Sequence, residues 1–333
     1  KTLSRIKLRL AYWHHWGIQS LSSAMPRAKR TCIRLALLVL AASLSRAFLG
    51  RTVAAFITLP KALRPPVLVL PGFGNAAEDY GEGELISTGE AVEDGGLVGR
   101  LQRRGFESVE VLPVARADWL RILGGLWDED FRAGSAPPDT AFGWYLDRVD
   151  ESVKQATSRT GQRVMLLAHS AGGWLGRAAL GRRGAALSEN VRAVVSLGSP
   201  HRRPEAEDQT RGALKFVDDN YPGAFLKSRG VEYVTVAGSA VLGDEAALQG
   251  TPERQAWVSY ERLVGRGDVP GDGIVPCDNA HLDGATQITL PNVRHSIGTP
   301  KSWYGADAVI DEWLPQVTFA LARQDLIGAL VSR

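Results

Sequence analysis

The sequence predicts an α/β fold with a mostly parallel central sheet and helices on both faces. Such a fold has room for a small cap above the sheet. From residue 65 onward, short and mostly apolar runs alternate with helix-like segments, and the run at 67–70 (VLVL) is apolar at every position. A run that is apolar at every position is typical of a strand buried on both faces. Strand and helix in alternation favour parallel pairing. Because no internal repeat or long linker interrupts the pattern, we expect one domain over residues 65–333.

The elements of this fold follow from the apolar pattern. The predicted strands, in chain order, are residues 67–70, 109–114, 164–167, 191–197, 233–237 and 287–290. Between them, apolar residues recur at three- and four-residue spacing, which predicts helices. The predicted helices are residues 97–104, 143–157, 175–180 and 307–321.

Composition excludes several classes of protein. A chain of 333 residues that is 44% hydrophobic and 23% charged can bury a sizeable globular core. Its two cysteines, Cys32 and Cys277, are too few for a disulfide scaffold or a cysteine-rich zinc site. Residues 65–333 carry 27 basic and 36 acidic side chains, a formal net charge of −9. An acidic body of this kind argues against nucleic acid as a partner.

The basic, acid-free residues 1–64 are predicted to be a targeting segment. Residues 25–47 have the order of a signal peptide, with Met25 as the initiator, and residues 1–24 are then an upstream stretch that is not part of the protein. The apolar run at 35–44 would rise only about 15 Å as a helix, half of a bilayer core. A transit-like stretch at 48–64 follows, so the order resembles the two-part plastid address of algae and predicts a plastid (chloroplast) location. Secretion, including the endoplasmic reticulum, and a mitochondrial presequence are the alternatives.

The chemistry begins where the predicted strand 164–167 ends. In the segment Ala168–Gly172 (AHSAG), small residues stand two before and two after a serine, and a helix-like segment follows at once. Such a turn lifts a serine hydroxyl clear of the sheet, above a helix N-terminus. We therefore predict Ser170 as a nucleophile. The alternative is a strand-ending turn that happens to contain a serine.

A glycine-rich loop follows the first predicted strand. Glycines Gly72 and Gly74 flank Phe73 and let the backbone approach a substrate. In acyl-transfer enzymes built on such sheets, this loop offers a backbone N–H to the developing oxyanion. We expect the Phe73 N–H in that role, together with the N–H of Ala171. A phosphate-binding loop is the weaker alternative, because no Gly-Lys-Ser/Thr or G-x-G-x-x-G pattern follows.

The general base is found by elimination among six histidines, two of which lie in the targeting segment. His169 precedes the serine and points away from it by strand alternation. His201 occupies a loop position that would shape the substrate pocket. His295 directly follows the last strand, where the order Ser…Asp…His places the base. His281 is the reserve candidate.

The acid should follow a strand and precede that histidine. Asp272 stands between two glycines, 23 residues before His295, in a loop that can fold to orient an imidazole. Asp268 is its main competitor. Calcium binding by Asp268, Asp272 and Asp278 is disfavoured, because these residues lack the dense alternation of an EF-hand loop. No metal site is predicted.

Together these motifs carry a family resemblance. Taken in order, VLVLPGFG (67–74), AHSAGGW (168–174), LGSPH (197–201), GDGIVP (271–276) and VRH (293–295) resemble the α/β-hydrolase superfamily. More narrowly, the chain is similar to the serine lipase/esterase-like proteins of plant and algal chloroplasts, which are relatives of lipases and GPI inositol-deacylases. The resemblance covers about residues 66–316. It implies a triad of Ser170, Asp272 and His295, with Phe73 and Ala171 as oxyanion donors.

The predicted function is that of a serine esterase or lipase that cleaves an acyl lipid or other apolar ester through an acyl-enzyme, without a cofactor. An acyltransferase and a catalytically silent relative that binds an apolar ligand are the alternatives. Trp119 within residues 118–121, together with Trp127 and the stretch 201–226, is predicted to form an apolar rim or cap that lines an acyl pocket, with a place in the core as the alternative. Acidic runs at 128–130 and 205–208 favour a neutral lipid or galactolipid over an anionic one, and peripheral membrane contact is expected.

Overall fold

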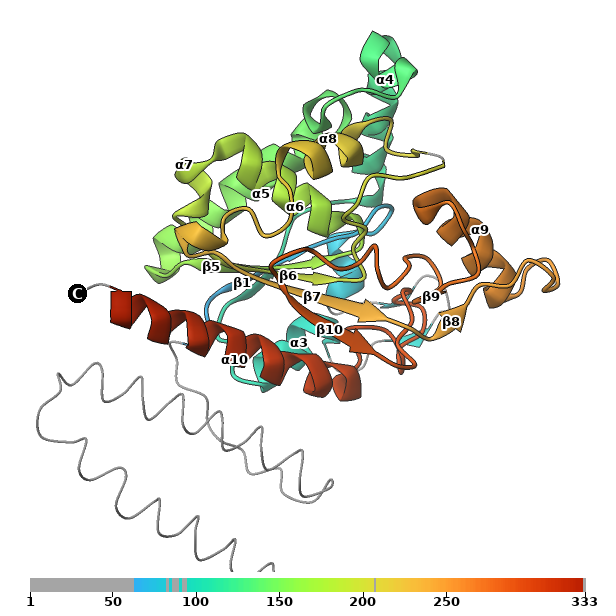
Figure 1. The fold of residues 1–333 in the computed structure, drawn as a ribbon. Helices are drawn as coiled ribbons and strands as arrows, with labels where there is room; N and C mark the ends of the chain where they lie inside the picture. Colours follow the sequence, from blue (N-terminus) through green and yellow to red (C-terminus); the bar gives the residue numbers. More distant parts are fainter. Residues whose placement is uncertain (1–62, 82–83, 86–89, 92–94, 207, 332–333) are drawn as a thin grey trace, which may run out of the picture. The chain divides into compact units, whose positions relative to one another are not determined.

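The computed structural model describes residues 63–81, 84–85, 90–91, 95–206 and 208–331 (Figure 1). The chain divides into two units, one of residues 59–318 and one of residues 1–58 with 319–333. The first unit contains the sheet and the site described below. Apart from residues 63 and 64, the predicted targeting segment lies outside the described residues. None of the helices in the described ranges is both long enough and apolar enough to cross a membrane.

The fold predicted from the sequence is confirmed. Within the described residues, a six-stranded parallel sheet has the order β10–β7–β6–β5–β1–β4. Each strand falls on one of the six apolar runs. The strands are β1 (Val67–Leu70), β4 (Val109–Val111), β5 (Val164–His169), β6 (Val191–Leu197), β7 (Glu232–Gly238) and β10 (Thr286–Leu290).

Helices cover both faces of this sheet, which is why β1, β5 and β7 are buried at every residue. One face carries α5 (Pro138–Thr160), α6 (Ala171–Arg183), α7 (Ala185–Ser188) and α8 (Ala213–Asn220) (Figure 1). The other carries α3 (Gly96–Arg103) and the part of α10 (Asp307–Val331) up to residue 318. Arg104, at the end of α3, ties these two helices together through Asp307 and Asp311.

Three predicted helices, α5, α6 and α10, are longer in the structure than in the sequence pattern. Helix α5 begins at Pro138, whose fixed φ suits the first helical turn, and is capped at its C-terminal end by Gly161 with φ +65°. Helix α6 begins at Ala171, four residues before the predicted start. The intervening Gly172 and Gly173 are poor helix formers, but tight packing requires them. A Cβ on Gly172 would lie 2.4 Å from the Leu70 carbonyl oxygen.

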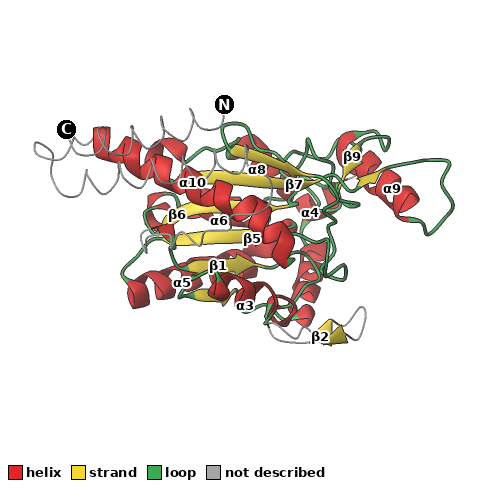
Figure 2. Ribbon diagram, turned by 90° about the horizontal axis from the view of Figure 1, so that it is seen from below, coloured by secondary structure: helices red, strands yellow, loops and turns green. Residues whose placement is uncertain are grey.

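The connections contain elements that the apolar pattern did not predict. The 3₁₀ helices are η2 (Ala77–Tyr80), η3 (Arg116–Trp127) and η4 (Lys227–Arg229). Besides α7 and α8, the added α-helices are α4 (Glu129–Ala133) and α9 (Pro252–Val264). Two short ribbons pair β2 (Glu84–Leu85) with β3 (Glu90–Ala91) and β8 (Val241–Leu242) with β9 (Pro270–Gly271). Figure 2 shows α4, α9 and β9 at one end of the parallel strands.

The strand order creates a crevice in the middle of the sheet. The chain passes from β1 outward to β4 and then returns to β5 on the other side of β1. The connections that leave the carboxyl ends of β1 and β5 therefore diverge. In open α/β sheets such a switch point is where ligands bind.

Candidate active site

Ser170 lies at this switch point, in the tight turn between β5 and α6. Its backbone has φ +52° and ψ −126°, a conformation that costs a non-glycine residue free energy. The turn is possible because its neighbours are small: a Cβ on Gly72 would lie 2.7 Å from the Ser170 Cβ. Of the small residues that marked this turn in the sequence, Gly172 is required by close backbone packing, since its Cβ would lie 2.4 Å from the Leu70 carbonyl oxygen.

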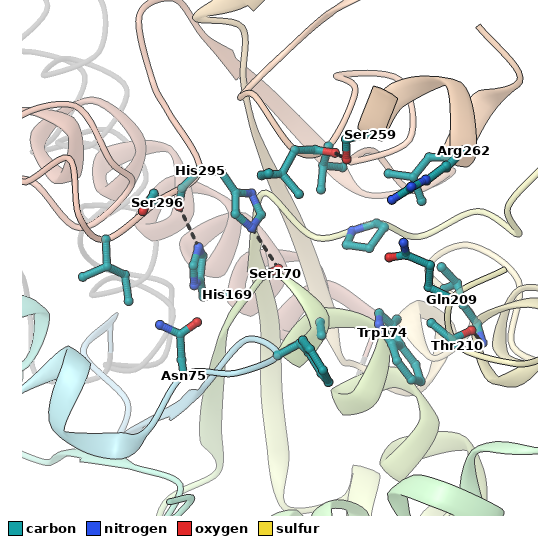
Figure 3. Close-up of a pocket in the computed structure, with 18 of the residues that line it drawn as sticks. Asn75, His169, Ser170, Trp174, Gln209, Thr210, Ser259, Arg262, His295 and Ser296 are labelled. Atoms are coloured by element: carbon teal, nitrogen blue, oxygen red, sulfur yellow. Dashed lines mark hydrogen bonds between the residues drawn. The ribbon is translucent and has the colours of Figure 1, made fainter. Parts of the chain in front are cut away.

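Three side chains from distant loops form one hydrogen-bonded line. His295, in the loop after β10, places Nε2 2.9 Å from Ser170 Oγ (Figure 3). Its Nδ1 lies 2.7 Å from Asp272 Oδ2. An ionised carboxylate can only accept, so the imidazole Nδ1 carries the proton and donates to Asp272. The imidazole Nε2 is then left to accept from the serine hydroxyl. The structure thus brings the three residues of the predicted triad together.

The Asp272 carboxylate is buried and surrounded by donors. The backbone N–H groups of Ile274 and Val275 donate to Oδ1 at 3.0 and 2.7 Å, and the Tyr304 hydroxyl donates to Oδ2 at 2.8 Å. Burial by itself raises the pKa of this carboxyl. The facing His295 ring, its hydrogen bond and the two N–H groups outweigh burial and leave the pKa below its ordinary value.

Asp268, the competing acid, lies elsewhere. Its side chain is 68% exposed and forms an ion pair with Arg266 at 2.9 Å. That hydrogen-bonded pair lowers the Asp268 pKa. Of the two aspartates, the structure places only Asp272 beside the histidine.

The predicted oxyanion donors border the same cavity as Ser170. Among the described residues, neither the Phe73 N–H nor the Ala171 N–H donates to a protein acceptor. The loop that carries Phe73 is held on two sides. The Gly72 N–H donates to the Tyr80 hydroxyl at 3.0 Å, and the Tyr145 hydroxyl donates to the Pro71 carbonyl at 2.9 Å.

His169 connects this loop to the loop of the triad histidine. Its Nε2 lies 3.1 Å from the His295 carbonyl oxygen and its Nδ1 lies 2.9 Å from the Tyr80 hydroxyl oxygen. Because a carbonyl can only accept, Nε2 carries the proton, and Nδ1 accepts from Tyr80. Burial, followed by the nearby His295 ring, lowers the pKa of His169 to about 3. A neutral imidazole with one fixed tautomer thus links Gly72 to His295.

The remaining predicted histidines do not reach Ser170. His201 is buried beside α6, where Arg177 donates to its backbone carbonyl at 3.1 Å and its Nε2 lies 2.9 Å from Ser196 Oγ. His281 lies between Thr235 and Thr289, with hydrogen bonds of 2.9 and 3.0 Å.

Of the predicted pocket residues, His169 lines the cavity, whereas Gly72, Gly74, His201 and Trp119 do not. Trp119 instead packs edge-on against the Phe73 ring, with the centroids 5.2 Å apart.

The cavity has a volume of about 830 Å³ and a mixed apolar and polar lining. Its apolar residues come mainly from helices and include Ile122, Phe142, Trp174, Leu214 and Leu263. Its polar residues include Asn75, Asp79, Arg116 and Ser296 from the connections after β1, β4 and β10, and Gln209, Thr210, Ser259 and Arg262 on the side of Trp174. Figure 3 shows Ser170 and His295 between Asn75 and Ser296 on one side and Trp174 on the other. Within the described ranges, no group of three or more His, Cys, Asp or Glu side chains is arranged to hold a metal ion.

The sequence did not reveal three tyrosines that support the site. Tyr80, Tyr145 and Tyr304 are fully buried and direct their hydroxyls at the loop after β1 or at Asp272. The available signal was indirect. Tyr80 and Tyr304 are large aromatic residues in otherwise polar loops, where a buried hydroxyl needs a partner.

Comparison with known proteins identifies a family. The family described as the PGAP1-like alpha/beta domain matches residues 145–324. No curated protein sequence matches the chain. The sheet is similar to that of the Bacillus licheniformis lipase BlEst2 in its mature form (16% identity, 80% of this chain and 96% of that chain, TM-score 0.49). It is also similar to phospholipase PlaB from Legionella pneumophila (11% identity, 80% and 62%, TM-score 0.45) and to the carboxylesterase EstE1, cloned from a metagenomic library (12%, 78% and 80%, TM-score 0.38).

Proposed function

The chain belongs to the family of PGAP1-like alpha/beta domains, and on that premise we propose that it is a serine hydrolase of carboxylic esters. The observation that carries the proposal is the hydrogen-bonded line from Asp272 through His295 to Ser170, with distances of 2.7 and 2.9 Å. A serine hydroxyl oriented by an imidazole, which is in turn oriented by a buried carboxylate, is the arrangement that activates a serine for acyl transfer.

Each group has a defined part in the reaction. As Ser170 Oγ bonds to the acyl carbon, His295 Nε2 takes the hydroxyl proton and then gives it to the departing alkoxide as the ester C–O bond breaks. The Asp272 carboxylate supports the imidazolium. The Phe73 and Ala171 N–H groups stabilise the oxyanion, by roughly 3 kcal/mol per donor in comparable sites. Water, activated by the same histidine, then releases the acid and restores the serine.

The mixed lining of the cavity favours an ester of an apolar acid with a polar, uncharged alcohol. The buried surfaces of Phe142, Trp174 and Leu214 suit an acyl chain. Of the charged lining residues, Asp79 and Arg116 form an ion pair with each other, so together they offer no net charge to a headgroup. A neutral lipid or galactolipid therefore suits the site better than a strongly anionic lipid.

Labelling with a fluorophosphonate tests the proposal directly. In the full-length chain we expect the wild type to react covalently and to hydrolyse a soluble short-chain ester, and Ser170→Ala to do neither. Ser108→Ala, a serine hydroxyl that bonds Glu110 outside the cavity, is the matched control and should behave as the wild type. A folded wild-type protein that neither labels nor turns over ester would overturn the proposal.

The plastid location also remains a proposal, supported by the order of signal-like and transit-like residues before residue 65. Residues 25–64 fused to a fluorescent protein should direct it to plastids in an alga with secondary plastids. Retention in the endoplasmic reticulum, secretion or mitochondrial import would refute it.

A further inference from the structure

Helix η3 presents a row of exposed leucines. A 3₁₀ helix has about three residues per turn, so side chains at every third position lie on one face. Over the twelve residues of η3, this period aligns Leu120, Leu123 and Leu126, which we call the leucine stripe. Their exposed fractions are 66%, 58% and 51%, and Trp127, at the end of the helix, is 88% exposed. Helix η3 is longer than most 3₁₀ helices, and it turns these three leucines and Trp127 outward.

The neighbouring face of η3 points inward and is tightly fixed. It consists of Trp119, Ile122 and Gly125, again three residues apart. Trp119 is buried and donates from Nε1 to the Asn75 carbonyl at 2.8 Å, and Ile122 lines the cavity. A Cβ on Gly125 would lie 2.7 Å from the Phe131 ring, so α4 packs directly against this turn. The turns that hold the stripe outside therefore form the cavity wall inside.

The third face anchors η3 to the rest of the domain. Asp118 accepts two hydrogen bonds from Arg148, at 2.6 and 3.0 Å, and a third from the Ala115 N–H at 2.9 Å. These hydrogen bonds, with burial opposing them, lower the Asp118 pKa. The stripe is thus held at the surface by a fixed scaffold.

Exposing these residues together is costly. Burying a leucine side chain stabilises a protein by about 1.5–3 kcal/mol, and each stripe residue forgoes much of that. Single exposed leucines are ordinary, but a contiguous apolar patch indicates a partner. A further exposed apolar residue lines the cavity itself: Phe73 is 64% exposed and packs on Trp119 of the same helix.

We propose that the leucine stripe, with Trp127, docks on a neutral or zwitterionic lipid surface and brings the cavity to it. This rests on the proposed function, since it supplies the source of an apolar ester. The stripe lies on the helix that lines the cavity through Ile122, so lipid held there lies next to the cavity that contains Ser170. A tryptophan indole suits the boundary between lipid and water. Charges of both signs flank the stripe, among them Arg121, Glu129 and Asp130, so anionic lipid gains no general attraction.

Two variants test this in the full-length chain: Leu123→Glu and Trp127→Glu, neither of which lines the cavity. Leu248→Glu, an equally simple change at a leucine that is 79% exposed elsewhere, is the matched control. We expect the wild type and the control to sediment with phosphatidylcholine vesicles. Each test variant should bind the vesicles at least about tenfold more weakly than the wild type, because the burial of one large apolar side chain in lipid is lost.

Turnover separates docking from chemistry. The same short-chain ester is supplied dissolved as monomers and then carried in the vesicles. We expect both variants to lose vesicle-borne turnover in proportion to binding and to keep kcat/KM for the dissolved ester within about twofold. Failure to hydrolyse the dissolved ester would count against the proposed function, while vesicle binding would still decide the docking proposal.

Three results would overturn the docking proposal. The first is wild-type binding by Leu123→Glu and Trp127→Glu. The second is vesicle binding only when the lipid is anionic. The third is a wild-type dimer that Leu123→Glu converts to a monomer without a change in vesicle binding, which would assign the stripe to a second copy of the chain.

Discussion

Removing one buried oxygen atom, by the substitution Tyr80→Phe, should slow ester hydrolysis without weakening substrate binding. The Tyr80 hydroxyl accepts from the Gly72 N–H at 3.0 Å and donates to His169 Nδ1 at 2.9 Å. The phenyl ring would keep its volume and its contacts, so the fold should survive. Two hydrogen bonds would be lost, one on the loop that carries Phe73 and one on the imidazole that holds the His295 carbonyl.

The structure bounds the size of this effect. Leaving a buried polar group without its partner costs about 1–3 kcal/mol, and we expect the free energy of unfolding to fall by that amount. Complete loss of an oxyanion donor costs roughly 100- to 1000-fold in kcat. Tyr80→Phe displaces the donor loop but removes no donor. We therefore expect a decrease in kcat of about 10- to 100-fold, which corresponds to about 1.4–2.8 kcal/mol, with KM within about twofold.

The assay compares kcat, KM and the rate of fluorophosphonate labelling for four variants: Tyr80→Phe, Tyr233→Phe, His169→Gln and His169→Leu. Tyr233→Phe is the control for loss of a buried tyrosine hydroxyl, because Tyr233 lies near the start of β7 and away from the cavity. It should keep kcat within about twofold. His169→Gln retains one acceptor and one donor and should keep more activity than His169→Leu. Wild-type kcat in Tyr80→Phe, or equal losses in the two His169 variants, would refute the positioning role.

Three further predictions follow from single contacts. Asp272→Asn should lower kcat on the order of 10⁴-fold by reversing the imidazole tautomer, whereas Asp268→Asn should change it less than about twofold; steady-state kinetics decides. Gly172→Ala, whose Cβ would lie 2.4 Å from a backbone carbonyl oxygen, should lower the free energy of unfolding in urea by about 1–3 kcal/mol, more than Gly176→Ala, whose Cβ meets a flexible leucine side chain at 2.9 Å. Because the folded pKa of His169 is about 3 against an ordinary 6.5, this histidine's contribution to stability should be complete above pH 6.5 and decrease as the pH falls towards 3; the slope is at most about 1.4 kcal/mol per pH unit, and His169→Gln should reduce it.

The features that the sequence predicted are those with a local signal. A strand buried on both faces is apolar along most of its length, and β5 shows this over residues 164–168 (VMLLA). The turn at Ser170 needs small neighbours at fixed offsets, so it also has a local pattern. Strand order was not predicted; in the structure the parallel connections bring the loops after β1, β5 and β10 to one edge.

The features that it missed depend on residues far apart in the chain. The Tyr80 hydroxyl meets a ring 89 residues away, and the Tyr304 hydroxyl meets a carboxylate 32 residues away. No local sequence pattern indicates that Tyr80 contacts His169 or that Tyr304 contacts Asp272. Helix η3 escaped for another reason: a three-residue period matches neither the strand period of two nor the helix period of 3.6. Trp119 was predicted to line the pocket, but it packs behind Phe73, which lines the cavity in its place.

The active site lowers the stability of the fold, and the packing of α6 that offsets this loss also fixes the geometry of the site. A non-glycine residue in the conformation of Ser170 costs on the order of 1–3 kcal/mol, and a neutral buried histidine makes the fold sensitive to acid. Helix α6 bears that strain, because its first turn is wedged between the Leu70 carbonyl and the core, with Trp174 packed edge-on against Phe142 at 5.1 Å. Relaxing the turn would require α6 to move away from the sheet. The position of the serine hydroxyl is therefore set by the core behind it, and core substitutions near Trp174 should lower kcat before they unfold the domain.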